Sequence, residues 1–298
     1  MRTTKRFTPH LLERFFRLGR GLGIFGDYIP WHRVSRSDPS SHGRSHLLQG
    51  KDRQHELLSD HEWVAIMFVF MLLDLLDVRE QYPLAQQEGR HEVGAYRVDI
   101  GDELFPGTLA LAAMLGFKPP KTTEGEESAN WVMTTDLLIA LRNDDSTVEL
   151  LAVAVKTIDE MEQKRKCELL AIEREYWIAR GVTWLLITPA LYEEQVALNL
   201  RMQMPWTLGE RASTRDRLTA VEVVRHFPGR SLTFILQQLE ATLGEMDLAQ
   251  RAFWQAVYCG EIPMNLRRGW RPHQPVVLLP HKDFVAQNPI ASRRSAWI

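Results

Sequence analysis

The stretch TTDLLIALRNDDSTVELLAVAVK, which ends at Lys156, constrains the fold of this chain more than any other. Two apolar runs of strand length flank the polar turn NDDST, a pattern typical of an antiparallel hairpin. If Arg142 pairs with Val148, the register places Asp136 opposite Ala154 on one face of the hairpin. Lys156 comes two residues after Ala154 and belongs to that face as well. A charged pair in so apolar a hairpin is either a structural ion pair or part of a site.

Two further carboxylates accompany the hairpin. Glu62 lies at the start of a strongly apolar segment, and Glu173 lies in the helical segment AIEREYW. Carboxylates gathered with a lysine at one end of a sheet can hold magnesium and position water for phosphodiester hydrolysis. The lysine supplies positive charge beside the reacting phosphate. The alternatives are a capping box with Ser59 for Glu62, and an exposed place in a charged helix for Glu173.

The order of elements around the hairpin predicts an α/β domain whose mixed sheet is covered by helices. The apolar segment SDHEWVAIMFVFMLLDLLDV predicts a buried helix over Ser59–Val78, and REQYPL predicts a strand after it. A helix over residues 161–180 and the strand VTWLLIT follow the hairpin. KPPKTTEGEESAN has the composition of a loop, and the acidic excursion between Glu88 and Phe105 has the character of an insertion.

Composition shifts divide the chain into three expected parts, residues 1–58, 59–200 and 201–298. Thr8 and Pro9 predict the start of a helix in the first part, followed by a polar, basic arm. We expect its histidines to lie on the surface: His32, His42, His46 and His55. The last part has two or three helical segments followed by PVVLLP. This order suits a winged helix-turn-helix, with a plain helical bundle as the alternative.

With 45% hydrophobic and 25% charged residues, the chain has the composition of a folded soluble protein. The longest apolar run, WVAIMFVFMLL, is shorter than the ~18 to 20 residues of a membrane span. The N-terminus lacks an apolar signal core, and two distant cysteines, Cys167 and Cys259, indicate a reducing compartment. We therefore expect no membrane partner and a cytoplasmic location.

The distribution of charge is uneven, although the net charge is only −2. Residues 1–58 hold 11 basic and 5 acidic side chains, and residues 196–298 hold 13 basic and 8 acidic ones. We expect any contact with phosphates to come mainly from these two ends. Ordinary solvated charge is the alternative.

Six motifs resemble those of the TnsA family, the endonuclease subunit of heteromeric cut-and-paste transposases. In chain order they are HELLSDHEW, VREQYPL, TLALAAMLGFKPP, MTTDLLI, VAVK and EREYWIARGVTWLLIT. The resemblance runs from about Arg44 to Thr188. It implies a restriction-endonuclease-like core of the PD-(D/E)XK kind, which cuts DNA. It also implies a C-terminal winged-helix domain, which contacts an AAA+ regulator.

Carried over by position, the resemblance makes Glu62 and Asp136 metal ligands and Lys156 the catalytic lysine. Ala154 stands where the family pattern has Glu or Gln, so one side-chain ligand is missing. We expect the backbone carbonyl of Val155 to serve instead, because a carbonyl oxygen is an acceptable magnesium ligand. We also expect Glu173 to contribute to the Mg²⁺ (or Mn²⁺) site, directly or through water.

The leading hypothesis is a magnesium-dependent DNA endonuclease that nicks the 5′ ends of a transposon. Its expected partners are transposon-end DNA, a DDE-type transposase subunit that cuts and joins the 3′ ends, and the AAA+ regulator. The alternative is a weakly active or inactive nuclease fold that bridges transposase, regulator and DNA. A stand-alone restriction or repair nuclease is a third possibility.

Overall fold

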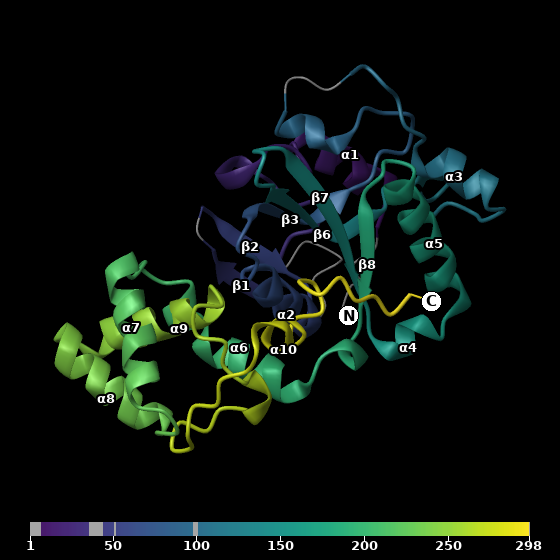
Figure 1. The fold of residues 1–298 in the computed structure, drawn as a ribbon. Coiled ribbons are helices and arrows are strands. Elements are labelled where there is room, and N and C mark those ends of the chain that lie inside the picture. Colours follow the sequence, from purple (N-terminus) through teal and green to yellow (C-terminus); the bar gives the residue numbers. More distant parts are fainter. Residues whose placement is uncertain (1–6, 36–43, 51, 98–100, 298) are drawn as a thin grey trace. The chain divides into compact units, whose positions relative to one another are not determined.

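The computed structural model describes residues 7–35, 44–50, 52–97 and 101–297 (Figure 1). The chain divides into two compact units, which are described separately. Unit 1 comprises Met1–Trp63, Asp74–Thr188 and Ala296–Ile298, and unit 2 comprises Val64–Leu73 and Pro189–Ser295. These units differ from the expected parts. No boundary falls at residue 58, and residue 200 lies inside helix α6 (Glu194–Thr207).

A four-stranded mixed sheet in the order β3-β6-β7-β8 forms the centre of unit 1. Strand β6 runs antiparallel to both β3 and β7, whereas β8 runs parallel to β7. The hairpin register is confirmed, because Arg142 pairs with Val148 and the same register continues to Leu137 and Val153. The predicted mixed-sheet α/β fold is therefore confirmed. The strands are β3 (Leu75–Pro83), β6 (Thr134–Arg142), β7 (Val148–Val155) and β8 (Thr183–Ile187).

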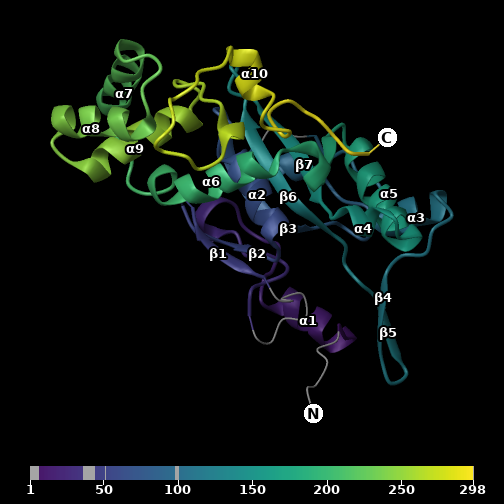
Figure 2. The same cartoon turned by 90° about the horizontal axis from the view of Figure 1, so that it is seen from below.

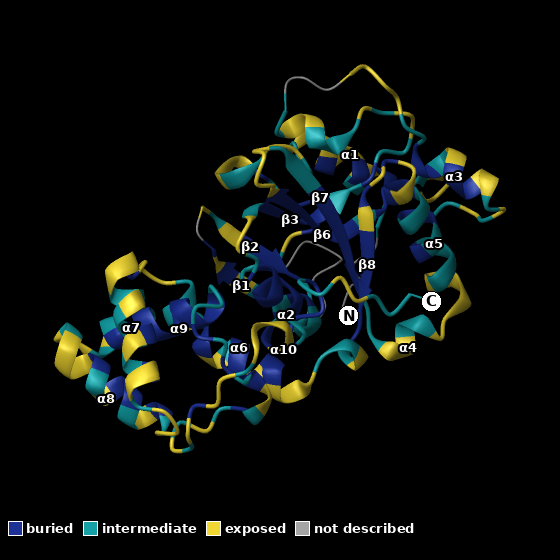
Figure 3. Ribbon diagram, viewed as in Figure 1, coloured by how far each residue is buried: buried dark blue, intermediate teal, exposed yellow. Residues whose placement is uncertain are grey.

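Helices α3 (Thr108–Met114) and α5 (Lys164–Ile178) pack on one face of this sheet (Figures 1 and 2). Alternate positions of β6 and β7 supply the apolar surface that they cover, and Ala154 is one of them. Asp136 has the same parity as the covered positions of β6, so it belongs to that face. Both strands are buried over most of their lengths (Figure 3).

The predicted helix over Ser59–Val78 is wrong in its second half. Helix α2 (Asp60–Val69) ends early, and Leu75–Val78 belong to β3, where Val78 pairs with Ile139. A continuous apolar run fits a buried helix and a buried strand equally well, so pairing with β6 decides the outcome. The predicted loop KPPKTTEGEESAN is also corrected. It contains the hairpin of β4 (Lys121–Glu124) and β5 (Glu127–Asn130).

The N-terminal segment belongs to unit 1. Helix α1 (Pro9–Arg17) begins as predicted, because the Thr8 side chain accepts the N–H of Leu11 at 3.2 Å. It packs Leu12 and Phe15 against Trp31 and Val132. The short strands β1 (His46–Gln49) and β2 (Gln54–Leu57) form a separate hairpin.

Two of the histidines expected on the surface are buried. His32 is packed among aromatic rings, and His55 lies 2.9 Å from a carboxylate oxygen of Glu80. His46 is partly buried and contacts Asp60, while His42 lies outside the described residues. The predicted insertion contains a short 3-10 helix, Glu92–Ala95, and Glu92 forms a buried ion pair with Arg180 of unit 1 at 2.9 Å.

Unit 2 is mainly helical. Its N-capped helix α7 is followed by α8, which ends at the left-handed Gly244, and by α9. The segments around these helices meet in isolated bridges between Ser231 and Pro275 and between Met264 and Leu278. No helix in the described ranges has the length and apolar character of a membrane span. The helices are α6, α7 (Thr214–His226), α8 (Leu232–Leu243), α9 (Met246–Tyr258) and α10 (His281–Val285).

Candidate active site

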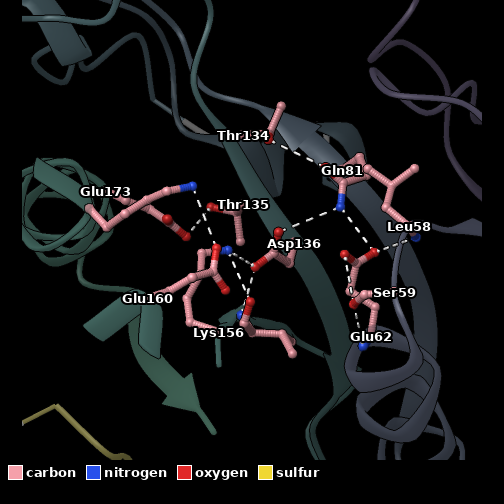
Figure 4. A network of polar contacts seen from close by, with 12 residues as sticks. Leu58, Ser59, Glu62, Gln81, Thr134, Thr135, Asp136, Lys156, Glu160 and Glu173 are labelled. Carbon is pink, nitrogen blue, oxygen red and sulfur yellow. Dashed lines mark hydrogen bonds and ion pairs between the residues drawn. The ribbon is translucent and has the colours of Figure 1, made fainter. Parts of the chain in front are cut away.

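The charged pair of the hairpin is a direct ion pair (Figure 4). Lys156 Nζ lies 2.5 Å from Asp136 Oδ2 and 3.0 Å from the carbonyl oxygen of Val155. The Val155 N–H donates to the same Asp136 oxygen at 2.6 Å. Asp136 precedes Leu137, the last β6 residue paired with β7, so its carboxylate accepts a strand N–H at the point where the ladder ends. The structure thus brings the three hairpin residues of the expected site together.

Glu62 lies in the first turn of helix α2, which Ser59 caps. Its N–H donates to Ser59 Oγ at 3.1 Å, and its own Oε2 accepts the N–H of Leu58 at 2.9 Å. Ser59 therefore caps the helix as predicted, and the carboxylate of Glu62 binds back to Ser59 Oγ and to the N–H of Leu58. This arrangement does not exclude a second role, because Oε2 also accepts from the Gln81 amide at 3.2 Å. Glu62 is buried, and this contact connects it to the sheet.

Gln81 joins Glu62 to Asp136. Its Nε2 donates to Glu62 Oε2 and lies 3.5 Å from Asp136 Oδ1, while its Oε1 accepts from Thr134 Oγ1 at 3.4 Å. Figure 4 shows the amide between the two carboxylates. The sequence reasoning missed Gln81, although it stands in the motif VREQYPL. Only the pairing of β3 with β6 places it here.

Glu173 is buried, with 4% of its surface exposed, so the alternative of an exposed helix residue is wrong. Its Oε1 accepts from Thr135 Oγ1 at 3.0 Å and from Trp184 Nε1 at 3.1 Å. Trp177 Nε1 in turn donates to Thr135 Oγ1 at 2.7 Å. Helix α5 therefore places a carboxylate beside Thr135, the residue before Asp136, where the charges of Asp136 and Lys156 act on it. The sequence reasoning singled out neither Thr135 nor Trp184, although they stand in the motifs MTTDLLI and EREYWIARGVTWLLIT.

The carboxylates of this site repel one another. Burial and the neighbouring charge of Asp136 raise the pKa of Glu62 to about 7, and they do the same to Glu173. Burial lowers the pKa of Lys156, but the charges of Asp136 and Glu173 outweigh it and raise this pKa above its ordinary value. Lys156 is thus a permanent cation, whose ammonium contacts the carboxylate of Asp136 directly.

The donor set fits a divalent cation by its chemistry. Oxygen ligands of carboxylate and carbonyl type are those that Mg²⁺ prefers, and the surplus of negative charge would be relieved by a second cation. In the described ranges, however, no three His, Cys, Asp or Glu side chains are already arranged as a metal cage. Lys156 Nζ contacts both the Val155 carbonyl and one oxygen of Asp136. Asp136 Oδ1, with its long contact to Gln81, is the less engaged oxygen.

Known proteins resemble the part of the chain that carries this site. Residues 74–189 match the family described as TnsA-like endonuclease N terminal. This range includes Asp136, Val155, Lys156 and Glu173, and it begins after Glu62. The chain is also 31% identical over 184 residues to the transposon Tn7 transposition protein TnsA of Escherichia coli, a region that covers 61% of this chain. It spans 58% of the length of that relative. Residues 74–189 are therefore similar to a TnsA-like endonuclease N-terminal domain, and the chain resembles a transposition protein over part of that protein's length.

Proposed function

We propose that this protein is a metal-dependent DNA endonuclease subunit of a cut-and-paste transposase, with a core of the restriction-endonuclease-like kind. It nicks the 5′ ends of the transposon, while a DDE-type transposase subunit cuts and joins the 3′ ends. The observation that carries this proposal is the Lys156–Asp136 pair at the end of β6 and β7, with Glu62 and Glu173 buried beside it. A purely structural ion pair would not require two more carboxylates with raised pKa values next to it.

Asp136, Glu62 and the Val155 carbonyl would hold Mg²⁺ or Mn²⁺, which when bound supplies Lewis-acid polarisation of the scissile phosphate. Asp136 Oδ1 is the favoured ligand atom, because Oδ2 already accepts two hydrogen bonds. The ammonium of Lys156 stabilises the negative charge that develops on the phosphate as water attacks. Glu173 contributes through water, since its Oε1 already accepts from Thr135 and Trp184.

Strand-specific cleavage in a reconstituted transposase tests this proposal. We expect Asp136→Asn and Lys156→Ala each to lower 5′-strand nicking by at least about a thousandfold, because each removes charge from the reacting centre. Cleavage of the 3′ strand by the partner subunit should continue. The matched controls are Asp144→Asn in the exposed turn and Lys164→Ala at the exposed start of α5.

The strand specificity separates two explanations of any loss. Equal loss of 5′ and 3′ cleavage would mean that Asp136 and Lys156 hold the complex together, and their catalytic roles would have to be abandoned. Loss of 5′ nicking alone, with both controls active, supports the proposal.

A weakly active or inactive bridging fold remains the second candidate, and one observation favours it. The side chain of Ala154 is a methyl group that lies fully buried in the apolar core under α5. This position therefore contributes no side-chain ligand. A wild-type protein that joins the transposase, the regulator and transposon-end DNA without nicking the 5′ strand would support this candidate.

We further propose that unit 2 is a winged-helix-like module that binds the AAA+ regulator. One bridge joins the residue before α8 to a segment after α9, and the other joins two segments after α9, which suits the wing of such a module. Helix α9, which such a module would place in DNA, is largely buried. Its Gln255 donates to the backbone carbonyls of Trp206 and Glu210, both at 2.9 Å. This packing favours contact with a protein over the reading of bases. Cross-links to the regulator should map to residues 189–295, and cross-links confined to residues 74–188 would contradict this role.

A further inference from the structure

Gln81 occupies an unusual backbone position for a residue inside a strand. Its φ is +50°, in the left-handed region that side chains other than glycine rarely adopt. On either side, Glu80 pairs with Leu137 and Tyr82 pairs with Thr135, whereas no pair joins Gln81 to Asp136 between them. Its carbonyl instead accepts the N–H of Trp31 at 3.3 Å. The strand thus departs from regular geometry at the one residue that faces the carboxylate pair.

The amide of Gln81 is almost completely buried, and its partners determine its orientation. Its NH₂ end faces Glu62 and Asp136, whose carboxylate oxygens accept hydrogen bonds. The oxygen end faces the hydroxyl of Thr134, which can donate. An NH₂ group carries two N–H donors and can serve both carboxylates at once, at 3.2 Å and 3.5 Å. It does so without adding charge.

We infer that Gln81 is a positioning residue, which holds the carboxylates of Glu62 and Asp136 together so that they bind one divalent cation. This inference rests on the proposed metal-dependent function. Without the bridge, the two carboxylates repel each other, and Glu62 retains only its capping contacts with Leu58 and Ser59. The left-handed backbone of Gln81 interrupts the regular pairing of β3 and directs the amide toward the two carboxylates.

Binding of Mn²⁺ to the full chain, measured by calorimetry in the absence of DNA, tests this role. We expect Gln81→Leu to weaken Mn²⁺ binding by about tenfold or more, as is typical when a group that orients metal ligands is removed. The control is Gln86→Leu. Gln86 lies in the same unit, but its amide donates to the backbone carbonyl of Asn130 at 2.9 Å, away from the carboxylates. Its substitution should leave Mn²⁺ affinity unchanged.

A double-mutant cycle shows whether Gln81 acts through Glu62. In a Glu62→Gln background, Gln81→Leu should cost less than about twofold in further affinity, because the bridge has already lost one of its carboxylates. If the two losses instead multiply, or if folded Gln81→Leu binds Mn²⁺ as tightly as wild type, the inference is overturned.

Gln81→Asn keeps the inference testable if the leucine variant fails to fold. Asparagine tolerates the left-handed backbone better than most residues, but its amide is one carbon shorter. We expect a folded protein with weakened Mn²⁺ binding, and wild-type affinity would contradict the bridge. A wild-type chain that shows the predicted coupling but does not nick DNA would overturn the proposed function and leave the role of Gln81 intact. One that binds no Mn²⁺ would overturn both.

Discussion

At the scale of single residues, the buried carboxylate of Glu80 in unit 1 is stabilised by its hydrogen-bond partners. Glu80, beside Gln81 on β3, is completely buried and accepts hydrogen bonds from Arg53, from the N–H of Glu56 and from the ring of His55. Burial raises its pKa, but Arg53 and His55 outweigh burial and lower the pKa to about 2. Glu80 therefore stays ionised in the folded protein at pH values where an exposed glutamate would be protonated.

Because the folded pKa of Glu80 lies below the unfolded value of 4.5, its contribution to stability is complete above pH 4.5 and is lost as the pH falls toward 2. We expect Glu80→Gln to lower the free energy of unfolding at pH 6. At pH 2 the same substitution should destabilise the protein by on the order of 3 kcal/mol less than it does at pH 6. Urea unfolding at both pH values measures this. The exposed Glu88→Gln is the control, and a difference between wild type and Glu80→Gln that does not change with pH would contradict the assignment.

At the scale of elements, the start of helix α2 combines a structural and a functional task. Ser59 Oγ accepts the N–H of Glu62 and donates to its carboxylate. The cap that begins the helix therefore also orients a carboxylate of the proposed site. Thr8 performs only the first task for helix α1. The two caps form a matched pair.

We expect Ser59→Ala and Thr8→Ala each to lower the free energy of unfolding by about 1 kcal/mol, the usual cost of removing a helix cap. Ser59→Ala alone should also lower 5′-strand nicking, by on the order of tenfold, because it releases Glu62. Chemical unfolding and the strand-specific assay measure the two effects. If both variants reduce nicking alike, reduced stability explains the result and the orientation of Glu62 by Ser59 does not matter.

At the scale of the whole molecule, residues distant in sequence build unit 2. Asn288 Nδ2 donates to the carbonyl oxygen of Phe68 at 2.8 Å, across 220 residues of sequence. Its Oδ1 accepts the N–H groups of Ile290 and Ala291. Truncation near Met204, which would isolate the expected core, removes Asn288 and divides α6. We therefore expect a fragment ending there to be unstable.

We expect Asn288→Ala to lower the free energy of unfolding by about 2 kcal/mol, because the buried Phe68 carbonyl and two N–H groups lose their partner. Asn265→Ala is the control. Its side chain caps a short 3-10 helix at Arg267, and its loss should cost clearly less. Thermal or urea unfolding measures both, and equal losses would show that the contact to Phe68 contributes nothing particular.

Local sequence determined several features of this protein. Thr8 and Pro9 specified where α1 begins, and the spacing of apolar runs around NDDST gave the register that brings Asp136 beside Lys156. Residues close in sequence interact through short-range geometry that repeats in every helix and hairpin. The six sequence motifs were sufficient to indicate the resemblance to the TnsA family.

The tertiary structure alone decided the rest. It placed Leu75–Val78 in a strand, buried Glu173 beneath β8, and assigned Val64–Leu73 to the C-terminal unit. It also turned Gln81 toward two carboxylates that lie 19 and 55 residues away in sequence. The physical reason is common to all four. Each depends on which distant segment supplies the hydrogen bonds and the apolar cover, and an apolar or polar residue is compatible with many such partners before the chain has folded.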